Sequence, residues 1–222
     1  MTGWQDLWQD PNIVAQWEKI PPVPQVVEMA DLLTSEGRTR ILDIGCGLGR
    51  HTVYLAARGF DVTATDNAPA ALAACRKNLD DLNLRAELLK LDMTAMDFPP
   101  GRFDGVVASN VIHHADLATL KRILTSITEM LAPRGLFVWV TPTPRHFAFG
   151  RGREIEPNTW IGSDAADGDL PHHYSTQPEV RDLLHAYEVL SIEERDYADD
   201  QGIRFHWRVL ARKTMTEDRE PR

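Results

Sequence analysis

Three acidic residues end three short apolar runs in the first half of the chain. Asp43 comes near the end of TRILDI, Asp66 ends DVTATD, and Asp92 ends AELLKLD. The segment GCGLGR follows Asp43 and carries glycines at alternate positions, Gly45, Gly47 and Gly49. Glycine permits a sharp turn and lets a ligand approach the backbone closely. The pattern indicates a loop that holds a small polar ligand, with carboxylates around it.

The charges around this loop favour one kind of ligand. The usual dinucleotide fingerprint is G-x-G-x-x-G, and the helix that follows it faces a pyrophosphate. Here the spacing is G-x-G-x-G, and Asp43 would repel a pyrophosphate but attract an ammonium or sulfonium group. Asp66 stands where an acid binds ribose hydroxyls, and Asp92 stands where a carboxylate can accept from an adenine amino group. We therefore predict a cationic, adenosine-bearing cofactor without phosphates.

Alternating strand-like and helix-like segments must position these acids. Runs rich in Val, Ile and Leu at 39–44, 61–66, 86–92, 103–109 and 135–141 alternate with amphipathic stretches at 50–59, 69–82 and 117–131. A helix at 176–187, capped by Thr176, and two final strands at 188–197 and 205–213 complete the pattern. Such alternation implies an α/β fold, a parallel sheet with helices on both faces.

The ordered segments LDIGCGLGR, VTATD, LLKLDMT and FDGVVASNVIHH resemble the class I S-adenosylmethionine-dependent methyltransferases, over roughly residues 38–142. The resemblance implies a Rossmann-like three-layer sandwich. Its mostly parallel seven-stranded sheet would have the order 3-2-1-4-5-7-6, with strand 7 antiparallel. The implied activity is methyl transfer from S-adenosyl-L-methionine to an N, O or S nucleophile of a small molecule by in-line displacement, which leaves S-adenosyl-L-homocysteine.

The resemblance also implies roles for residues of the cofactor site. The glycines would line the amino-acid part of the cofactor, and Asp43 would be linked to its ammonium group. Asp66 would hold the ribose hydroxyls, Asp92 and Met93 would contact the adenine, and Asn110 and His113 would lie near the methyl group. The complete expected set is Asp43, Gly45, Cys46, Gly47, Gly49, Asp66, Asn67, Asp92, Met93, Asn110 and His113.

Histidines supply candidate bases. A base is needed only if the acceptor must lose a proton, and histidine titrates near neutral pH. We predict catalytic roles for His113, after the fourth strand, and for His173 and Tyr174, near the end of a long segment at 141–175. The pairs at 113–114 and 172–173 raise the alternative of a metal site. No carboxylate or cysteine stands at a fixed ligand spacing from them, so we expect no metal.

The chain divides into three parts by composition. We expect an N-terminal helical arm or lid at 1–37, a methyltransferase domain at 38–213 and a flexible tail at 214–222. Trp4, Trp8 and Trp17 lie in the arm, where packing and a lid role both remain open. The insertion at 141–175 is rich in Pro, Gly and Asp and is expected to cover the substrate. Its arginines would bind an anionic acceptor, and they are Arg145, Arg151 and Arg153.

Composition limits the remaining alternatives. The chain has 222 residues, 43% of them hydrophobic, and a net charge of -9, which disfavours a nucleic-acid partner. Its 2 cysteines make no disulfide framework, and no apolar run approaches the ~18 residues of a membrane span. We expect a cytoplasmic monomer or homodimer without a membrane partner. Two other functions stay open: a non-catalytic module that binds the same cofactor and, with less support, a nicotinamide-dependent oxidoreductase.

Overall fold

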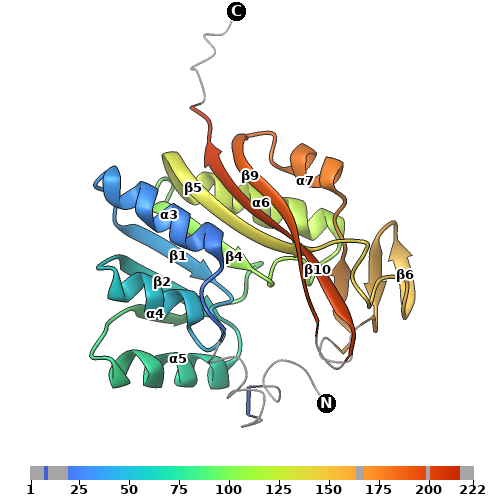
Figure 1. Ribbon diagram of the computed structural model, residues 1–222, viewed down its shortest axis with the longest axis horizontal. Coiled ribbons are helices and arrows are strands. Elements are labelled where there is room, and N and C mark those ends of the chain that lie inside the picture. Colours follow the sequence, from blue (N-terminus) through green and yellow to red (C-terminus); the bar gives the residue numbers. More distant parts are fainter. Residues whose placement is uncertain (1–7, 10–19, 164–167, 199–200, 216–222) are drawn as a thin grey trace, which may run out of the picture.

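A seven-stranded sheet of order β3-β2-β1-β4-β5-β10-β9 forms the centre of the computed structural model, which describes residues 8–9, 20–163, 168–198 and 201–215 (Figure 1). The strands are β1 Arg40–Ile44, β2 Asp61–Asp66, β3 Glu87–Lys90, β4 Phe103–Ser109, β5 Leu131–Pro142, β9 Tyr187–Ala198 and β10 Ile203–Lys213. β10 pairs antiparallel with both β5 and β9, and the other pairs are parallel. Since β9 and β10 are the sixth and seventh strands of this sheet, the predicted α/β fold and strand order are confirmed.

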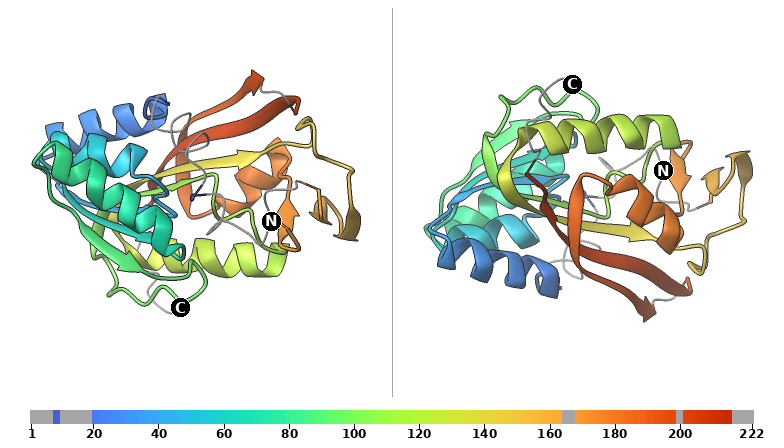
Figure 2. Two further views of the ribbon diagram at one scale, coloured as in Figure 1. Left: turned by 90° about the horizontal axis from the view of Figure 1, so that it is seen from below. Right: turned by 90° about the horizontal axis from the view of Figure 1, so that it is seen from above.

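Helices cover both faces of the sheet (Figure 2). One face carries α3 Pro24–Ser35, α4 Arg50–Ala57 and α5 Pro69–Asp81, and the other carries α6 Leu117–Met130 and α7 Gln177–Leu183. Side chains alternate between the faces along each strand. In β1, Ile41 packs in the cluster around α3, whereas Leu42 packs in the cluster around α6. Among the described residues, no helix is both long and apolar enough to cross a membrane.

Part of the expected N-terminal arm belongs to the core of the domain. Helix α3 starts with Pro24 in its first turn, where the missing N–H costs nothing, and it lies directly over β4. A Cβ at Gly105 would lie 2.9 Å from Leu33 Cδ1 and 3.1 Å from Met29 Sδ. Trp8 is buried against Leu48 and the start of α5. Residues 1–7 and 10–19, which include Trp4 and Trp17, and residues 216–222 of the expected tail lie outside the described residues.

The insertion forms a second, three-stranded antiparallel sheet beyond the carboxyl ends of the central strands (Figure 1). Its strands are β6 Arg153–Glu156, β7 Thr159–Ile161 and β8 Pro171–His173. Asn158 adopts a left-handed conformation (φ 64°) in the turn between β6 and β7. Backbone hydrogen bonds join this sheet to the domain, because His173 N donates to His113 O at 2.9 Å and Ser175 N donates to Pro142 O at 3.0 Å. The insertion is therefore a structured cap rather than a loose loop.

An ion pair between an exposed arginine and a buried carboxylate fixes β1 beside β4 at the opposite, amino end of the sheet. Asp104, only 6% exposed, accepts from the backbone N–H groups of Thr39 and Arg40 and from the Arg40 guanidinium at 2.9 and 3.1 Å. Burial alone would raise the pKa of Asp104, but the hydrogen bonds from Arg40 outweigh it and lower the pKa. The ionised carboxylate therefore stabilises the fold.

Replacing Asp104 by Asn should lower the free energy of unfolding by about 1–3 kcal/mol at pH 7, because an amide N–H would face the donors of Arg40. The folded pKa lies below the unfolded one, so this contribution is present above the unfolded pKa and disappears as the pH falls through the folded pKa. The gap between wild type and variant should therefore narrow below about pH 4 in urea unfolding curves. Asp81→Asn, at an exposed pair with Lys77, is the matched control and should change little. A gap that is the same at every pH would contradict this account.

Candidate active site

The loop between β1 and α4 has a shape that only glycine permits. Gly45 and Gly49 both have left-handed backbones, with φ of 63° and 88°. A Cβ at Gly45 would lie 2.3 Å from Val111 Cγ2, and a Cβ at Gly49 would lie 2.5 Å from Cys75 Sγ. The loop is therefore held between the segment after β4 and helix α5, and its backbone stays open to a ligand at the sheet edge.

Asp66, at the end of β2, holds the glycine loop in place. Its two carboxylate oxygens accept from the backbone N–H groups of Gly47 at 3.0 Å and Ala68 at 2.9 Å. The side chain is buried, which raises its pKa against the lowering effect of these hydrogen bonds. Each carboxylate oxygen has a further lone pair, so Asp66 can accept from a ligand while it keeps the loop in shape.

Asp43 lies behind the loop and is fully buried. Its Oδ2 accepts from Thr52 Oγ1 at 2.6 Å. Burial raises the pKa of Asp43 to about 6, although the Thr52 hydrogen bond and the nearby charge of Arg50 oppose the shift. A buried carboxyl with such a pKa is typical of functional sites.

Arg50 is a residue of this site that the sequence analysis did not identify. It is the first residue of α4, and its guanidinium donates to Ser109 Oγ at 3.3 Å, across the edge of the sheet. Its own pKa is lowered by burial, and the Asp43 charge opposes that effect. Its position directly after the last glycine was the available signal, because a helix that starts there directs its first side chain toward the loop.

Replacing Asp43 by Asn should stabilise the protein at pH 8 by up to about 3 kcal/mol, since the folded pKa of about 6 exceeds the ordinary value of 3.8. Between these two values the folded state binds more protons than the unfolded chain. The penalty of the buried charge therefore grows as the pH rises through this range and is complete above it. Urea unfolding at a series of pH values should show the advantage of the variant at pH 7–8 and its loss near pH 4. Asp61→Asn, on an exposed position of β2, should show no such pH dependence. Destabilisation of Asp43→Asn at every pH would contradict the assignment.

The predicted adenine-side residues lie together at the ends of β2 and β3. Asp92 Oδ1 accepts from Thr94 Oγ1 at 2.6 Å and from Thr94 N at 2.8 Å. The Thr94 hydroxyl lowers the pKa of Asp92 most, and a hydrogen bond from Asn67 adds to that effect. Met93 is half-buried and packs against the core cluster around α6. These residues form a polar and an apolar wall next to the glycine loop.

Cys46 is a buried thiol within the glycine loop. Its pKa is raised well above the ordinary value by a hydrogen bond with Cys75 and by burial. A protonated thiol is a poor nucleophile, so Cys46 contributes small size and backbone to the loop rather than covalent chemistry.

Two residues after β4 present buried polar atoms at the sheet edge. Asn110 has a left-handed backbone (φ 55°), which is strained for a non-glycine residue, and its N–H donates to Val140 O at 3.1 Å. Its buried Oδ1 has no hydrogen-bond partner within the described part of the chain. His113 is 3% exposed, and burial, followed by the neighbouring histidines, lowers its pKa well below the ordinary value. His113 is therefore a neutral imidazole at pH 7.

The structure brings His172, rather than His173, to His113. The ring centroids of His113 and His172 are 4.5 Å apart, and His172 is stacked on Tyr174 at 4.7 Å. The His173 ring instead lies between Thr159 Oγ1 at 2.8 Å and Glu179 Oε2 at 3.2 Å. Successive side chains of a strand point to opposite faces, so β8 directs these two histidines in opposite directions. Of the predicted catalytic residues, His173 is joined to His113 by a backbone hydrogen bond, from its N–H to His113 O at 2.9 Å.

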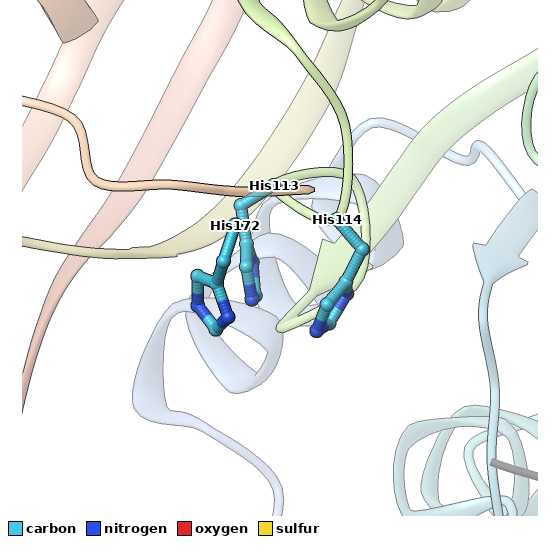
Figure 3. Close-up of side chains that lie close together, drawn as sticks. All are labelled: His113, His114 and His172. Atoms are coloured by element: carbon cyan, nitrogen blue, oxygen red, sulfur yellow. The ribbon is translucent and has the colours of Figure 1, made fainter. Parts of the chain in front are cut away.

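His113, His114 and His172 form a compact cluster (Figure 3). One ring nitrogen from each can be chosen so that all three lie within 4.8 Å of one another. The histidine pairs at 113–114 and 172–173 had raised a metal site as an alternative. Which of them meet could not be predicted, because His172 belongs to the distant insertion and reaches the other two only through β8.

The arginines of the insertion have separate contacts. Arg145 pairs with Glu194 at 2.5 Å and lies over the Phe205 ring at 4.0 Å. Arg151 lies over the Phe147 ring at 5.0 Å, and Arg153 is exposed in β6. These contacts do not bring the three guanidinium groups together, so a shared anion site on them remains a prediction.

Two surface grooves adjoin the helices. One, of about 950 Å³, lies between α6 and α7 and is lined by none of the predicted site residues. The other, of about 580 Å³, is bounded by Leu48, Gly49 and Arg50 together with Pro21 and Pro22. Only the second contacts the glycine loop. The larger groove is remote from the candidate chemistry, so its size does not make it the active site.

The fold is that of S-adenosylmethionine-dependent methyltransferases of known structure. A solved enzyme of this kind from Methanosarcina mazei has a TM-score of 0.70 and 18% identity, over 88% of this chain and 100% of that chain. The 1,6-didemethyltoxoflavin-N1-methyltransferase of Burkholderia thailandensis, solved with 1,6-didemethyltoxoflavin and S-adenosylhomocysteine, has a TM-score of 0.66 and 22% identity, over 95% and 85%. At these identities the likeness establishes the fold.

Sequence comparison finds a more specific relationship than fold comparison does, over the segment that contains the first strands. Residues 41–135 match the family described as a methyltransferase domain. The demethylmenaquinone methyltransferase of Thermus thermophilus is 33% identical over 123 residues, which are 54% of this chain and 55% of that relative. The chain thus spans about half the length of the first curated relatives that it matches. The resemblance to S-adenosylmethionine-dependent methyltransferases is confirmed over this segment, which includes the glycine loop and the three acids.

Proposed function

We propose that the protein transfers a methyl group from S-adenosyl-L-methionine to a small-molecule acceptor. The observation that carries this proposal is the glycine loop clamped by Asp66, with the buried carboxyl of Asp43 behind it. A phosphate-free cationic cofactor suits this site, whereas a pyrophosphate would meet two acids.

The polar atoms of the site match the groups of such a cofactor. Asp66 would accept from the ribose hydroxyls, and the buried Oδ1 of Asn110 would accept from the ammonium group. Arg50 stands at the same edge and would pair with the carboxylate. Asp92 and Met93 would bind the adenine. The neutral state of His113 fits a neighbouring sulfonium, because a protonated imidazole would repel it.

The reaction needs positioning more than it needs acid–base groups. The cofactor supplies a methyl group on a sulfonium, which leaves as a neutral thioether when the acceptor atom attacks. The protein must hold that atom about 3–3.5 Å from the methyl carbon and in line with the breaking bond. The loop after β4 and the insertion sheet bound the space where the acceptor would lie. There His113 would take the acceptor proton where one must be lost, and Tyr174 and His173 would fix the surrounding wall.

Calorimetric titration of cofactor-stripped protein with S-adenosylmethionine, S-adenosylhomocysteine and NAD tests the cofactor. Binding of the first two in the micromolar range, about -8 kcal/mol, is expected, without binding of NAD. Asp66→Ala should weaken S-adenosylhomocysteine at least about 100-fold, because two hydrogen bonds to a charged group are lost.

The matched control is Asp61→Ala, at the exposed start of the same strand, which should bind like wild type. Equal binding by the Asp66 variant, or binding of NAD alone, would refute the proposed cofactor site. Tight cofactor binding without turnover of any metabolite would favour the non-catalytic module instead.

We also propose that the acceptor is anionic and is held by arginines of the insertion. Converting both Arg151 and Arg153 to Ala should raise the acceptor KM by about tenfold or more, as the loss of charge-assisted hydrogen bonds predicts. The affinity for S-adenosylhomocysteine should stay unchanged. Arg76→Ala, at an exposed position of α5, is the matched control. Once an acceptor has been found by screening, an unchanged KM in the double variant would refute this part of the proposal.

A further inference from the structure

We propose that His113, His114 and His172 bind one divalent transition-metal ion of the zinc class. This site differs from the sequence-based expectation of no metal. Its ligands come from two segments, the loop after β4 and strand β8, whose three rings converge in Figure 3. The binding of the ion does not depend on the proposed function, although the role given to it below does.

The distances require only small movements of the rings. In a tetrahedral zinc site with Zn–N bonds of about 2.0–2.1 Å, ligand nitrogens are about 3.4 Å apart. Here the chosen nitrogens already lie within 4.8 Å of one another. The three ring centroids are 4.1, 4.5 and 5.1 Å apart in pairs, so side-chain rotation can close the remaining gap.

A hydrogen bond orients His114 as a ligand. Its Nδ1 lies 2.8 Å from Val111 O, and a carbonyl can only accept, so Nδ1 carries the proton and donates it. The lone pair is then on Nε2. Metal-binding histidines commonly donate their other N–H to a backbone carbonyl, which fixes the tautomer and the ring orientation.

His113 provides a further, independent observation that favours a bound ion. Its Nδ1 is buried and has no hydrogen-bond partner in the described ranges. Buried polar atoms nearly always have a partner, and an orphaned one costs about 1–3 kcal/mol. A metal ion in the cluster would satisfy this nitrogen.

The protein holds His172 in position from several sides. Its ring is stacked on Tyr174 with an interplanar angle of 11°, and the Tyr174 hydroxyl donates to Ser163 Oγ at 3.0 Å. Its backbone is paired with Trp160 in β7. The hydrogen bond from His173 N to His113 O ties β8 to the loop that carries the other two ligands. The ligand set is thus largely preformed.

The chemistry of the donors selects the metal. Three neutral imidazoles suit zinc, cobalt, nickel, copper or iron, whereas calcium and magnesium prefer oxygen ligands. Three protein ligands leave a coordination position for water or for a substrate atom, as in catalytic zinc sites. With neutral ligands the ion keeps its full charge, so it acts strongly on whatever occupies that position.

If the proposed methyl transfer holds, this ion assigns a class of acceptor, a molecule with a hydroxyl or thiol group. Bound at the open position, the group would release its proton to solvent and not to His113, because the metal would occupy the lone pair of that ring. The bound anion would then reduce the positive charge of the ion beside the sulfonium. The resulting oxygen or sulfur anion would form a bond to the methyl carbon as the carbon–sulfur bond of the cofactor breaks, and that electron pair would return to the sulfur. The metal would change neither its oxidation state nor its protein ligands.

Titration of EDTA-treated, dialysed protein with cobalt chloride and zinc chloride tests the site by visible absorption and calorimetry. We expect one equivalent to bind, with the absorption bands of a low-symmetry cobalt site. His172→Ala and His114→Ala should each weaken binding at least about 100-fold. The half-exposed position of His114 makes its variant the safer one for folding, and circular dichroism would check both. His185→Ala, an exposed histidine at the end of α7, should bind like wild type.

Absence of stoichiometric binding by wild type, or equal binding by all three variants, would overturn the proposed site and indicate an adventitious ion only. The affinity for S-adenosylhomocysteine is measured on the same samples, so failure of the cofactor proposal is seen separately. Methyl transfer that is equal in metal-free and metal-loaded protein would overturn the catalytic role.

Discussion

The hydrogen bonds that Asp66 accepts from the backbone of Gly47 and Ala68 are the constraint on which the site depends. They join the end of β2 to the loop after β1, and so fix a backbone that three left-handed glycines have already bent. Burial of the carboxylate costs desolvation energy, which the two N–H donors offset only in part, so the pKa of Asp66 stays raised. Neighbouring side chains then take their places: Asp43 behind the loop, and Arg50 across the sheet edge toward Ser109.

Backbone and side-chain hydrogen bonds both attach the insertion sheet to the domain. Bonds from His173 N to His113 O and from Ser175 N to Pro142 O attach it to the ends of β4 and β5. The Glu156 side chain of β6 adds to this attachment, because its Oε1 accepts from Leu117 N at the start of α6 at 2.6 Å. The His173 ring, with Thr159 and Glu179, stabilises the cap from its other face. The strand alternation of β8 thus separates a supporting histidine from one that faces the site.

Local patterns made the fold and the glycine loop predictable. Three of the strand runs carried an acid at or near their ends, and parallel strands place such ends at one edge, so Asp43, Asp66 and Asp92 could be grouped from the sequence. The antiparallel place of β10 came from resemblance and is confirmed. The choice between His172 and His173 could not be predicted, because it depends on the register of β8 against β7, within a segment whose composition indicates loop. Packing of the N-terminal arm was one of two alternatives, and the strands that α3 contacts could not be named from local patterns because they are distant in the sequence.

The position of β10 in the sheet also sets an order of assembly. This strand lies between β5 and β9, and its backbone accepts hydrogen bonds from the start of the insertion, from Thr143 N to Phe205 O and from Phe147 N to Ile203 O. In a chain emerging from a ribosome, the start of the insertion therefore lacks these two acceptors until residues 203–213 have been made. Contacts between residues far apart in sequence form slowly and leave strand edges exposed in the meantime. Until then β5 is an open edge of the sheet, at which non-native strand pairing can begin.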